Sequence, residues 1–144
     1  MDWRDIRPTA LGIVRREGDE ILVQRYEDDG EQFFRPLGGG LEFGERAADA
    51  LVREFDEELD EAVVPGERLG VLENVFEFEE TPGHEVVFVF EAHFADRSVY
   101  ECEELAGFED DGSGEFTARW EPMSRFTDGD DTLYPEGLPT LLAE

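Results

Sequence analysis

Short apolar runs bounded by turn residues recur along the chain, which is the pattern of β-strands. Two such runs, 9–15 and 20–25, are joined by Glu17-Gly18-Asp19, which has the composition of a hairpin turn. Two longer runs rich in Val and Phe flank Thr81-Pro82-Gly83 and predict a second strand pair. The segments that predict strands are 9–15, 20–25, 33–35, 68–78, 85–94 and 116–120, the last of them expected to be the final strand.

One segment repeats its apolar residues at the spacing of a helix instead. Residues 45–59 contain no Gly or Pro, and Pro65-Gly66 follows as a stop. Its apolar positions are Ala48, Leu51, Val52, Phe55 and Leu59. They recur every three or four residues and predict an amphipathic helix. Strands before and after a central helix indicate one α+β or layered α/β domain over residues 1–144.

The segments between these elements predict turns and loops. Pro36-Leu37-Gly38-Gly39-Gly40 is expected to interrupt regular structure and to let the backbone approach a partner closely. Residues 26–30 predict an acidic loop, and residues 96–114 predict a long loop or a loop with a short helix. Residues 138–143 predict a short terminal helix.

Charge changes the picture more than any other bulk property. The chain has 39 Asp and Glu against 12 basic residues, all of them Arg, and a formal net charge of −27. A disordered tail or a nucleic-acid mimic could share this composition, but the carboxylates interleave with apolar runs such as 86–90. We therefore favour a globular protein adapted to molar salt. No basic stripe exists to displace counterions, which argues against nucleic-acid binding.

Cysteine content and hydropathy narrow the protein class further. Cys102 is the single cysteine, so no internal disulfide can form, and with only His84 and His93 it makes a poor zinc site. No apolar run is long enough to span a bilayer, and residues 1–5 do not resemble the start of a signal segment. We expect a soluble cytoplasmic protein without a membrane partner.

The predicted helix carries a carboxylate cluster that suggests metal binding. Glu54, Glu57 and Glu58 stand at i, i+3 and i+4, which places them together on a side distinct from the apolar stripe. Adjacent carboxylates repel one another unless a cation lies between them, and their oxygens suit Mg²⁺ or Mn²⁺. Arg53 can reach Glu57 one turn later, and Glu45 lies at the start of the helix. These contacts would orient the cluster.

The same residues resemble a known sequence motif. Gly39-Gly40-Leu41-Glu42-Phe43-Gly44-Glu45, seven further residues and then Arg53-Glu54-Phe55-Asp56-Glu57-Glu58 resemble the box of the Nudix (MutT-like) hydrolases. Every fixed position of that core is matched within residues 39–61. The family usually has Gly two residues after the Glu pair, where this chain has Asp60. Asp tolerates the left-handed conformation, so we expect Asp60 to serve at the helix end.

The resemblance implies a fold, a metal and a set of site residues. The fold would be the Nudix α/β/α sandwich with a mixed sheet. Glu54, Glu57, Glu58 and the Gly39 carbonyl would bind Mg²⁺ or Mn²⁺, and Arg53 and Glu45 would complete the catalytic set. Arg25 and Arg35 are candidates for phosphate contacts next to Gly39 and Gly40, because the guanidinium fork matches phosphate oxygens; each is as readily a surface ion pair.

The resemblance further implies a metal-dependent hydrolase of a nucleoside diphosphate linked to another group. ADP-ribose, nucleotide sugars, dinucleoside polyphosphates and nucleoside triphosphates all remain open as substrates, and so does a homodimer. The base for the attacking water is either a box glutamate or a loop carboxylate such as Glu103 or Glu104. Phe33, Phe76 and Phe78 belong either to a nucleoside pocket or to the core. The alternative function is a Nudix-fold module that senses a nucleotide without cleaving it.

The charge of −27 predicts that stability depends on salt. Repulsion acts over a Debye length of about 30 Å at 0.01 M salt but only about 3 Å at 1 M, so molar KCl should stabilise the folded state. We expect the melting temperature to rise with KCl concentration, and Mg²⁺ to raise it further by binding only the folded helix. Melting curves recorded across KCl concentrations, with and without Mg²⁺, measure both effects. A melting temperature that stays flat from 0.1 M to several molar KCl would contradict the adaptation to salt.

Overall fold

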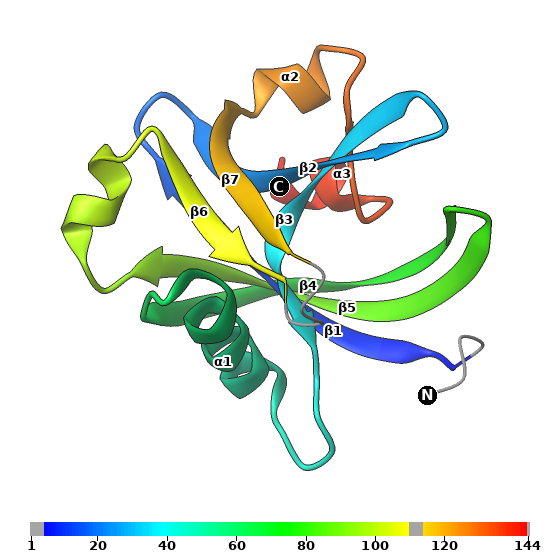
Figure 1. Ribbon diagram of the computed structural model, residues 1–144, viewed down its shortest axis with the longest axis horizontal. Coiled ribbons are helices and arrows are strands. Elements are labelled where there is room, and N and C mark those ends of the chain that lie inside the picture. The colour runs from blue at the N-terminus through cyan, green and yellow to red at the C-terminus, as the bar shows by residue number, and fades with distance from the viewer. Residues whose placement is uncertain (1–4, 110–113, 144) are drawn as a thin grey trace.

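Eight strands form one mixed sheet in the described residues, 5–109 and 114–143, of the computed structural model (Figure 1). The strands are β1 (Arg7–Arg16), β2 (Glu20–Asp28), β3 (Glu31–Gly40), β4 (Val63–Phe78), β5 (Thr81–Phe94), β6 (Glu104–Phe108), β7 (Glu115–Pro122) and β8 (Thr132–Leu133). The helices are α1 (Ala47–Leu59), the 3₁₀ helix η1 (Arg97–Glu101), α2 (Ser124–Thr127) and α3 (Leu138–Leu142). The strand order is β4-β5-β1-β3-β2-β7-β6, with β8 beside β3.

Strand β1 lies at the centre of the sheet and is buried on both faces from Thr9 to Val14. It pairs in parallel with β5 and antiparallel with β3. Successive side chains of a strand point to opposite faces. Ala10 and Val14 accordingly pack in the cluster that contains α1, and Leu11 and Ile13 in the cluster that contains α2 and α3. Helices thus cover both faces, and the predicted α/β/α sandwich is confirmed.

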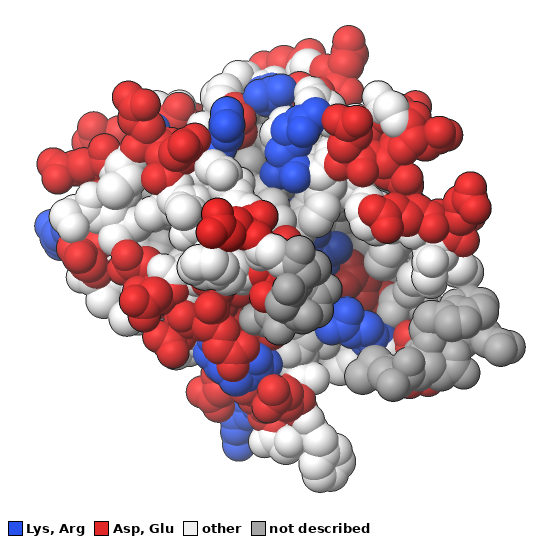
Figure 2. Space-filling model, viewed as in Figure 1, with Lys and Arg blue, Asp and Glu red and all other residues white. Residues whose placement is uncertain are grey.

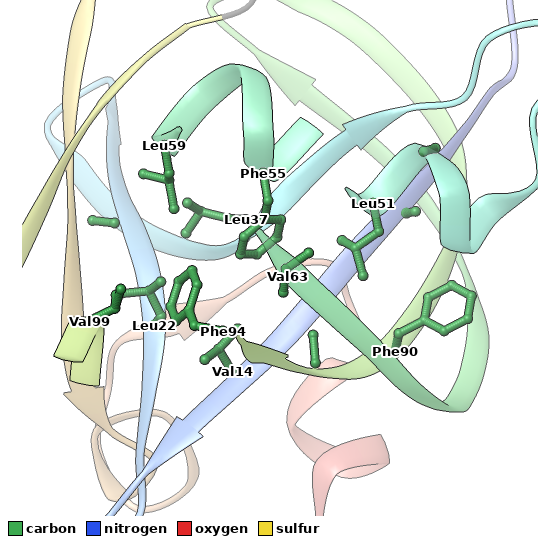
Figure 3. Packing of buried hydrophobic residues seen from close by; sticks show 14 of the residues in the cluster. Val14, Leu22, Leu37, Leu51, Phe55, Leu59, Val63, Phe90, Phe94 and Val99 are labelled. Carbon is green, nitrogen blue, oxygen red and sulfur yellow. The ribbon is translucent and has the colours of Figure 1, made fainter. Parts of the chain in front are cut away.

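Helix α1 is held on the sheet by its apolar stripe (Figure 3). Leu51, Phe55 and Leu59 point into the cluster formed with strand residues such as Val14 and Phe94, and all are buried. Burial of each large side chain contributes about 1.5–3 kcal/mol. A Cβ on Gly12 would lie 3.2 Å from Leu51 Cδ1, so the helix packs closely on the centre of β1. The predicted helix over 45–59 is thereby confirmed, beginning at Ala47.

The expectation that the glycine run interrupts regular structure was wrong. Gly38, Gly39 and Gly40 belong to β3 and pair with Leu11, Ala10 and Thr9 of β1. Main-chain hydrogen bonds to β1 hold the segment although it lacks side chains. Gly38 has φ +152°, and a Cβ there would overlap the carbonyl oxygen of Ala10. The glycines therefore permit close strand contact instead of breaking the strand.

Other expected loops are also more regular than predicted. The acidic loop at 26–30 is mostly strand, because β2 and β3 pair up to Asp28 and Glu31. The β4–β5 pair turns at Glu79 and Glu80, both with positive φ, and not at residues 81–83. The described part of 96–114 contains η1 and β6, whose backbone pairs with β7. The short strand β8 follows β7, so the segment 116–120 is not the last strand. Among the described residues, no helix is long and apolar enough to span a membrane.

At the end of α1 the chain has Asp60 where the family usually has Gly. Asp60 caps the helix with φ 54° and ψ 39°, and its N–H donates to the carbonyl of Asp56 at 2.9 Å. This is the left-handed conformation that glycine adopts without steric cost. Asp60 therefore occupies the usual glycine position with the expected geometry.

We predict that Asp60→Gly stabilises the protein by about 0.5–1 kcal/mol, because it removes the steric cost of a Cβ in the left-handed region. The measurement is the urea midpoint in molar KCl. Asp128→Gly is the matched control, since Asp128 caps α2 with φ −108° and its exchange removes the same charge. An equal gain in both variants would assign the effect to charge and contradict the conformational explanation.

Candidate active site

A cavity of about 1160 Å³ lies where the carboxylates of α1 meet the glycine end of β3. The β2–β3 and β4–β5 hairpins extend on the other side of it, as the loops at the right of Figure 1 show. Glu54, Glu57 and Glu58 line the cavity together with Gly39 and Gly40. The structure therefore brings the predicted metal ligands and the glycine run into one site.

The sequence predicted that all three carboxylates lie on a solvent-facing side of the helix, away from the apolar stripe. In the structure only one of them is exposed. Glu54 is 3% exposed and Glu58 is 8% exposed, whereas the Glu57 side chain is 47% exposed. A Cβ on Gly39 would overlap the carboxylate of Glu54. The missing side chain of Gly39 thus creates the space that lets Glu54 pack inward against β3.

Arg53 connects the parts of this cluster. Its Nε and Nη2 donate to the two carboxylate oxygens of Glu45 at 2.8 and 3.0 Å. Its Nη1 donates to Glu54 at 3.0 Å and to Glu57 at 3.2 Å, and its Nη2 also donates to the Gly40 carbonyl at 2.9 Å. The predicted contacts of Arg53 with Glu57 and Glu45 are confirmed. One guanidinium therefore links two glutamates of α1 to the segment just before the helix and to the end of β3.

These contacts shift the ionisation of the residues that make them. Hydrogen bonds from Arg53 lower the pKa of Glu45 to about 2, and the backbone N–H of Glu42 adds to the effect. The hydrogen bonds that Arg53 donates to Glu45 also raise the pKa of Arg53 above its ordinary value, against the opposing effect of burial. Both groups are accordingly charged throughout the neutral range.

The donor set suits a hard divalent cation in kind. Glu54, Glu57, Glu58 and the Gly39 carbonyl offer only oxygen ligands, the type that Mg²⁺ and Mn²⁺ prefer. The space left by Gly39 keeps the buried Glu54 carboxylate at the cavity wall. Within the described ranges, however, no three His, Cys, Asp or Glu side chains are close enough to hold a metal ion. Glu54 and Glu57 are oriented toward Arg53 instead.

Arg35 lies in the cavity but is engaged by a carboxylate. Its Nη1 and Nη2 donate to the two oxygens of Glu85 at 2.7 and 3.0 Å. Glu85 is 5% exposed and also accepts from Asn74 at 2.9 Å. Burial raises the pKa of Glu85, but the hydrogen bonds from Arg35 and Asn74 outweigh it and lower the pKa overall. The phosphate contact of Arg35 stays a prediction, and its terminal nitrogens already serve Glu85.

Arg25 lies outside the cavity lining. On the exposed side of β2 its Nε donates to Gln32 at 2.8 Å and its Nη2 to Glu27 at 2.9 Å. The reading of Arg25 as a surface ion pair matches these contacts, and its phosphate contact stays a prediction without support from its position. Glu103 and Glu104 also lie outside the lining, and Glu104 pairs with Arg119 at 3.6 Å.

Aromatic rings form the wall of the cavity near the hairpin tips. Tyr26 stacks on Phe33 with centroids 5.2 Å apart, and Phe78 meets both rings edge-on. Tyr134, after β8, meets Phe33 edge-on at 5.1 Å. Phe33, Phe76 and Phe78 all line the cavity, are only partly buried and belong to neither hydrophobic core cluster, so their positions match the pocket interpretation and not the core one. Burial raises the pKa of the Tyr26 phenol well above its usual range, and nearby Glu109 adds to this effect.

Comparison with known families decides the classification. The model of the NUDIX domain matches residues 5–137. The chain belongs to the NUDIX domain family. It is a hydrolase of this family, whose members act on pyrophosphate bonds. Nudix hydrolases generally use divalent metal ions, and the relatives act on small nucleotide derivatives. No curated protein matches the chain.

Solved structures show the same fold at low sequence identity. The MutT NUDIX hydrolase from Burkholderia pseudomallei is 20% identical, with a TM-score of 0.67 over 97% of this chain and 98% of that one. The ORF135 protein of E. coli is 20% identical, with a TM-score of 0.65 over 96% and 88% of the two chains. An ADP-ribose pyrophosphatase from Streptococcus suis is 16% identical, with a TM-score of 0.56 over 95% and 89%. These likenesses establish the Nudix fold alone.

Several lining residues were not singled out from the sequence. Glu109 lines the cavity and accepts from Gln24 Nε2 at 2.8 Å, whereas the two loop carboxylates named in advance do not reach it. Arg7, Asn74 and Tyr26 are further examples. Their positions in the chain carry no motif, because strand pairing from distant segments brings them together. The sequence held a weak signal for Asn74. It and Glu73 are the two polar residues of the otherwise apolar run 71–76.

The lowered pKa of Glu45 predicts a pH-dependent contribution to stability. A carboxylate whose folded pKa lies near 2 stabilises the folded state above its unfolded pKa of about 4.5, and loses that contribution as pH falls toward 2. Glu45→Gln should therefore lower the melting temperature at pH 6, and the difference from the parent protein should vanish near pH 2. Melting curves in molar KCl measure it, with Glu67→Gln as the control for one lost charge. A difference independent of pH would contradict the ion pair as its source.

Proposed function

We propose that this Nudix protein is a divalent-metal-dependent hydrolase of a nucleoside diphosphate linked to another group. One observation carries the proposal. A single arginine, Arg53, binds Glu45, Glu54, Glu57 and the Gly40 carbonyl at the wall of a large cavity. One cation here holds several carboxylates in fixed positions at a cavity wall. Carboxylates that served only the stability of the fold could remain in solvent without such a partner, so the arrangement favours a catalytic role.

The proposed metal ligands are Glu54, Glu57, Glu58 and the carbonyl of Gly39, with Mg²⁺ or Mn²⁺ as the ion. When bound, such an ion neutralises charge on a diphosphate and lowers the pKa of a water molecule. Arg53 keeps Glu54 and Glu57 at the wall and offsets part of their repulsion. Glu45 holds Arg53 in turn through two hydrogen bonds. The protein thereby contributes mainly charge and position, as is general for phosphoryl transfer.

The group that accepts the proton of the attacking water has two kinds of candidate. One is a box glutamate, and Glu57 is the most accessible of the three proposed metal ligands on α1. The other is a loop carboxylate, for which Glu109 is better placed than Glu103 or Glu104 because it lines the cavity. Exchange of Glu57 and of Glu109 to Gln, with activity followed against pH, separates them, since loss of the base removes the acidic limb of the profile.

The aromatic wall supports a planar group on the substrate. Tyr26, Phe33, Phe78 and Tyr134 offer ring faces and edges against which a nucleobase can pack. The name of the Streptococcus suis neighbour, an ADP-ribose pyrophosphatase, agrees with this substrate class. Acidic side chains are spread across the face in Figure 2, among uncharged residues and fewer basic ones, which supports a small-molecule partner and not nucleic acid. A cytoplasmic location remains an expectation, and a homodimer remains open.

A substrate screen tests the proposal against the non-catalytic alternative. Purified protein in molar KCl is incubated with Mg²⁺ or Mn²⁺ and with ADP-ribose, nucleotide sugars, dinucleoside polyphosphates and nucleoside triphosphates. Chromatography of the products is the measurement. Metal-dependent cleavage of any of these between two phosphorus atoms supports the hydrolase. Tight binding of one compound without turnover would instead favour a nucleotide-sensing module.

Glu57 offers the cleanest test of the metal cluster, because it is the least buried of the three glutamates. We predict that Glu57→Gln lowers kcat by orders of magnitude and changes the melting temperature without metal only slightly. Asp56→Asn is the control, since it removes one charge from the neighbouring exposed position outside the cavity. Turnover of Glu57→Gln within about tenfold of the parent, or about 1.4 kcal/mol, would remove Glu57 from the mechanism.

A further inference from the structure

Three arginines line the cavity in the described part of the chain, and two of them are committed to carboxylates. Arg35 gives both terminal nitrogens to Glu85, and Arg53 serves Glu45, Glu54 and Glu57. Arg7 is the third. It forms no ion pair and no hydrogen bond through its guanidinium with another described residue. Arg7 is exposed and lines the cavity, so its guanidinium is accessible to an anion that enters it.

The carboxylate whose charge Arg7 affects already has other partners. Arg7 stands opposite Glu85 in the parallel pairing of β1 and β5, and its charge contributes to the lowered pKa of Glu85. One oxygen of Glu85 accepts from Arg35 and Asn74, and the other accepts from Arg35 and, at 3.5 Å, from Thr9. Both oxygens are thus occupied, and within residues 5–109 and 114–143 the Arg7 guanidinium has no acceptor of its own.

The position of Arg7 is set by the third glycine of the run. A Cβ on Gly40 would overlap Nη2 of Arg7 and would lie 3.4 Å from its Cζ. The guanidinium therefore rests against the bare α-carbon of Gly40, while the Gly40 carbonyl accepts from Arg53. Gly39 makes room for Glu54 in the same way. Each of these two glycines accommodates one charged group of the cavity.

Glu54 and Arg7 flank the end of β3 from its two faces. Successive residues of a strand point to opposite faces and lie about 3.3 Å apart along it. Gly39 and Gly40 thus place a carboxylate on one face and a guanidinium on the other. Residues 37–40 pair with β1 on one side, and no described strand pairs with their other edge. Both side chains line the same cavity around this open edge.

We propose that Arg7 binds a phosphate group of the substrate, across the open edge of β3 from the carboxylate cluster. The inference rests on the proposed function and names a binding residue outside the box. Guanidinium offers planar paired donors that match phosphate oxygens. A diphosphate at this edge meets the metal-binding carboxylates on one side and Arg7 on the other. Its charge is then neutralised from two directions, which lets an otherwise acidic cavity hold an anion.

The test compares Arg7→Gln and Arg7→Lys with the control Arg68→Gln. Arg68 is exposed on β4 and lies outside the cavity lining. Its exchange to Gln removes one positive charge, as the exchange of Arg7 to Gln does. Two measurements are made in molar KCl with Mg²⁺: steady-state kinetics on whichever compound the parent cleaves, and calorimetric titration with inorganic pyrophosphate. Pyrophosphate carries the diphosphate without a base, and its binding requires no turnover.

We expect Arg7→Gln to raise KM and to weaken pyrophosphate binding by about tenfold or more, with kcat changed much less. Arg7→Lys should recover part of the loss, and Arg68→Gln should match the parent. Gly40→Ala should weaken pyrophosphate binding in the parent, because it displaces Arg7, but should add little in the Arg7→Gln background. Such non-additive effects of the two exchanges identify the contact between Gly40 and Arg7 even if one variant is less stable. Melting curves measure the stability of each variant.

Equal pyrophosphate affinity and KM in Arg7→Gln and Arg68→Gln would overturn the proposal, and so would a parent protein that does not bind pyrophosphate with Mg²⁺. Failure of the proposed function has a different signature, namely a parent that binds pyrophosphate through Arg7 but cleaves no compound of the screen. Additive effects of Gly40→Ala and Arg7→Gln on pyrophosphate binding would contradict the packing of the Arg7 guanidinium against Gly40.

Discussion

The structure of the site depends on the close approach of α1 to a part of β3 that has no side chains. Glu54 can lie buried against the sheet only because Gly39 lacks a Cβ. Arg53, the preceding residue, then reaches the Gly40 carbonyl, Glu45 and Glu57 together. The apolar stripe of α1 supplies the packing energy for this approach, since Leu51 and Phe55 are fully buried on the strands (Figure 3). Hydrophobic burial thereby places charged groups where they would not gather by themselves.

The chain has a net charge of −27, so its few basic side chains can neutralise carboxylates only at particular places. Arginine supplies every positive side chain, and its fork serves several acceptors at once, as Arg53 and Arg35 show. The outer surface carries acidic groups spread across the visible face, among uncharged residues and fewer basic ones (Figure 2). The cavity lining is acidic as well, but it adds three arginines and several aromatic rings. Under the proposed function, these groups would meet the phosphate and the planar ring of the substrate.

Much of this arrangement could be predicted from the sequence, because it is local. The spacing of the apolar residues predicted α1, and the runs rich in Val and Phe predicted the strands. The helical spacing of Arg53 and Glu57, with Glu45 at the start of the predicted helix, predicted the contacts of Arg53. Asp60 also adopted the expected left-handed conformation. The glycine run was misinterpreted, since composition alone favours a turn and only the pairing with β1 makes residues 38–40 a strand. The buried state of Glu54 was missed for the same reason.

The sequence by itself determined the family, the position of the helix and the identity of the clustered carboxylates, because each depends on residues within about one turn or one strand of each other. Only the tertiary structure decided which side chains share the cavity. Arg7 and Glu85 are 78 positions apart in the chain but lie on strands that pair in parallel. Glu109, which directly follows β6, reaches Gln24 of β2 across β7. Such neighbours are fixed by sheet order and hydrogen-bond register, which hydrophobic periodicity does not encode. For that reason Arg25 and Arg7, equally basic in the sequence, lie in different surroundings: one outside the cavity lining and one within it.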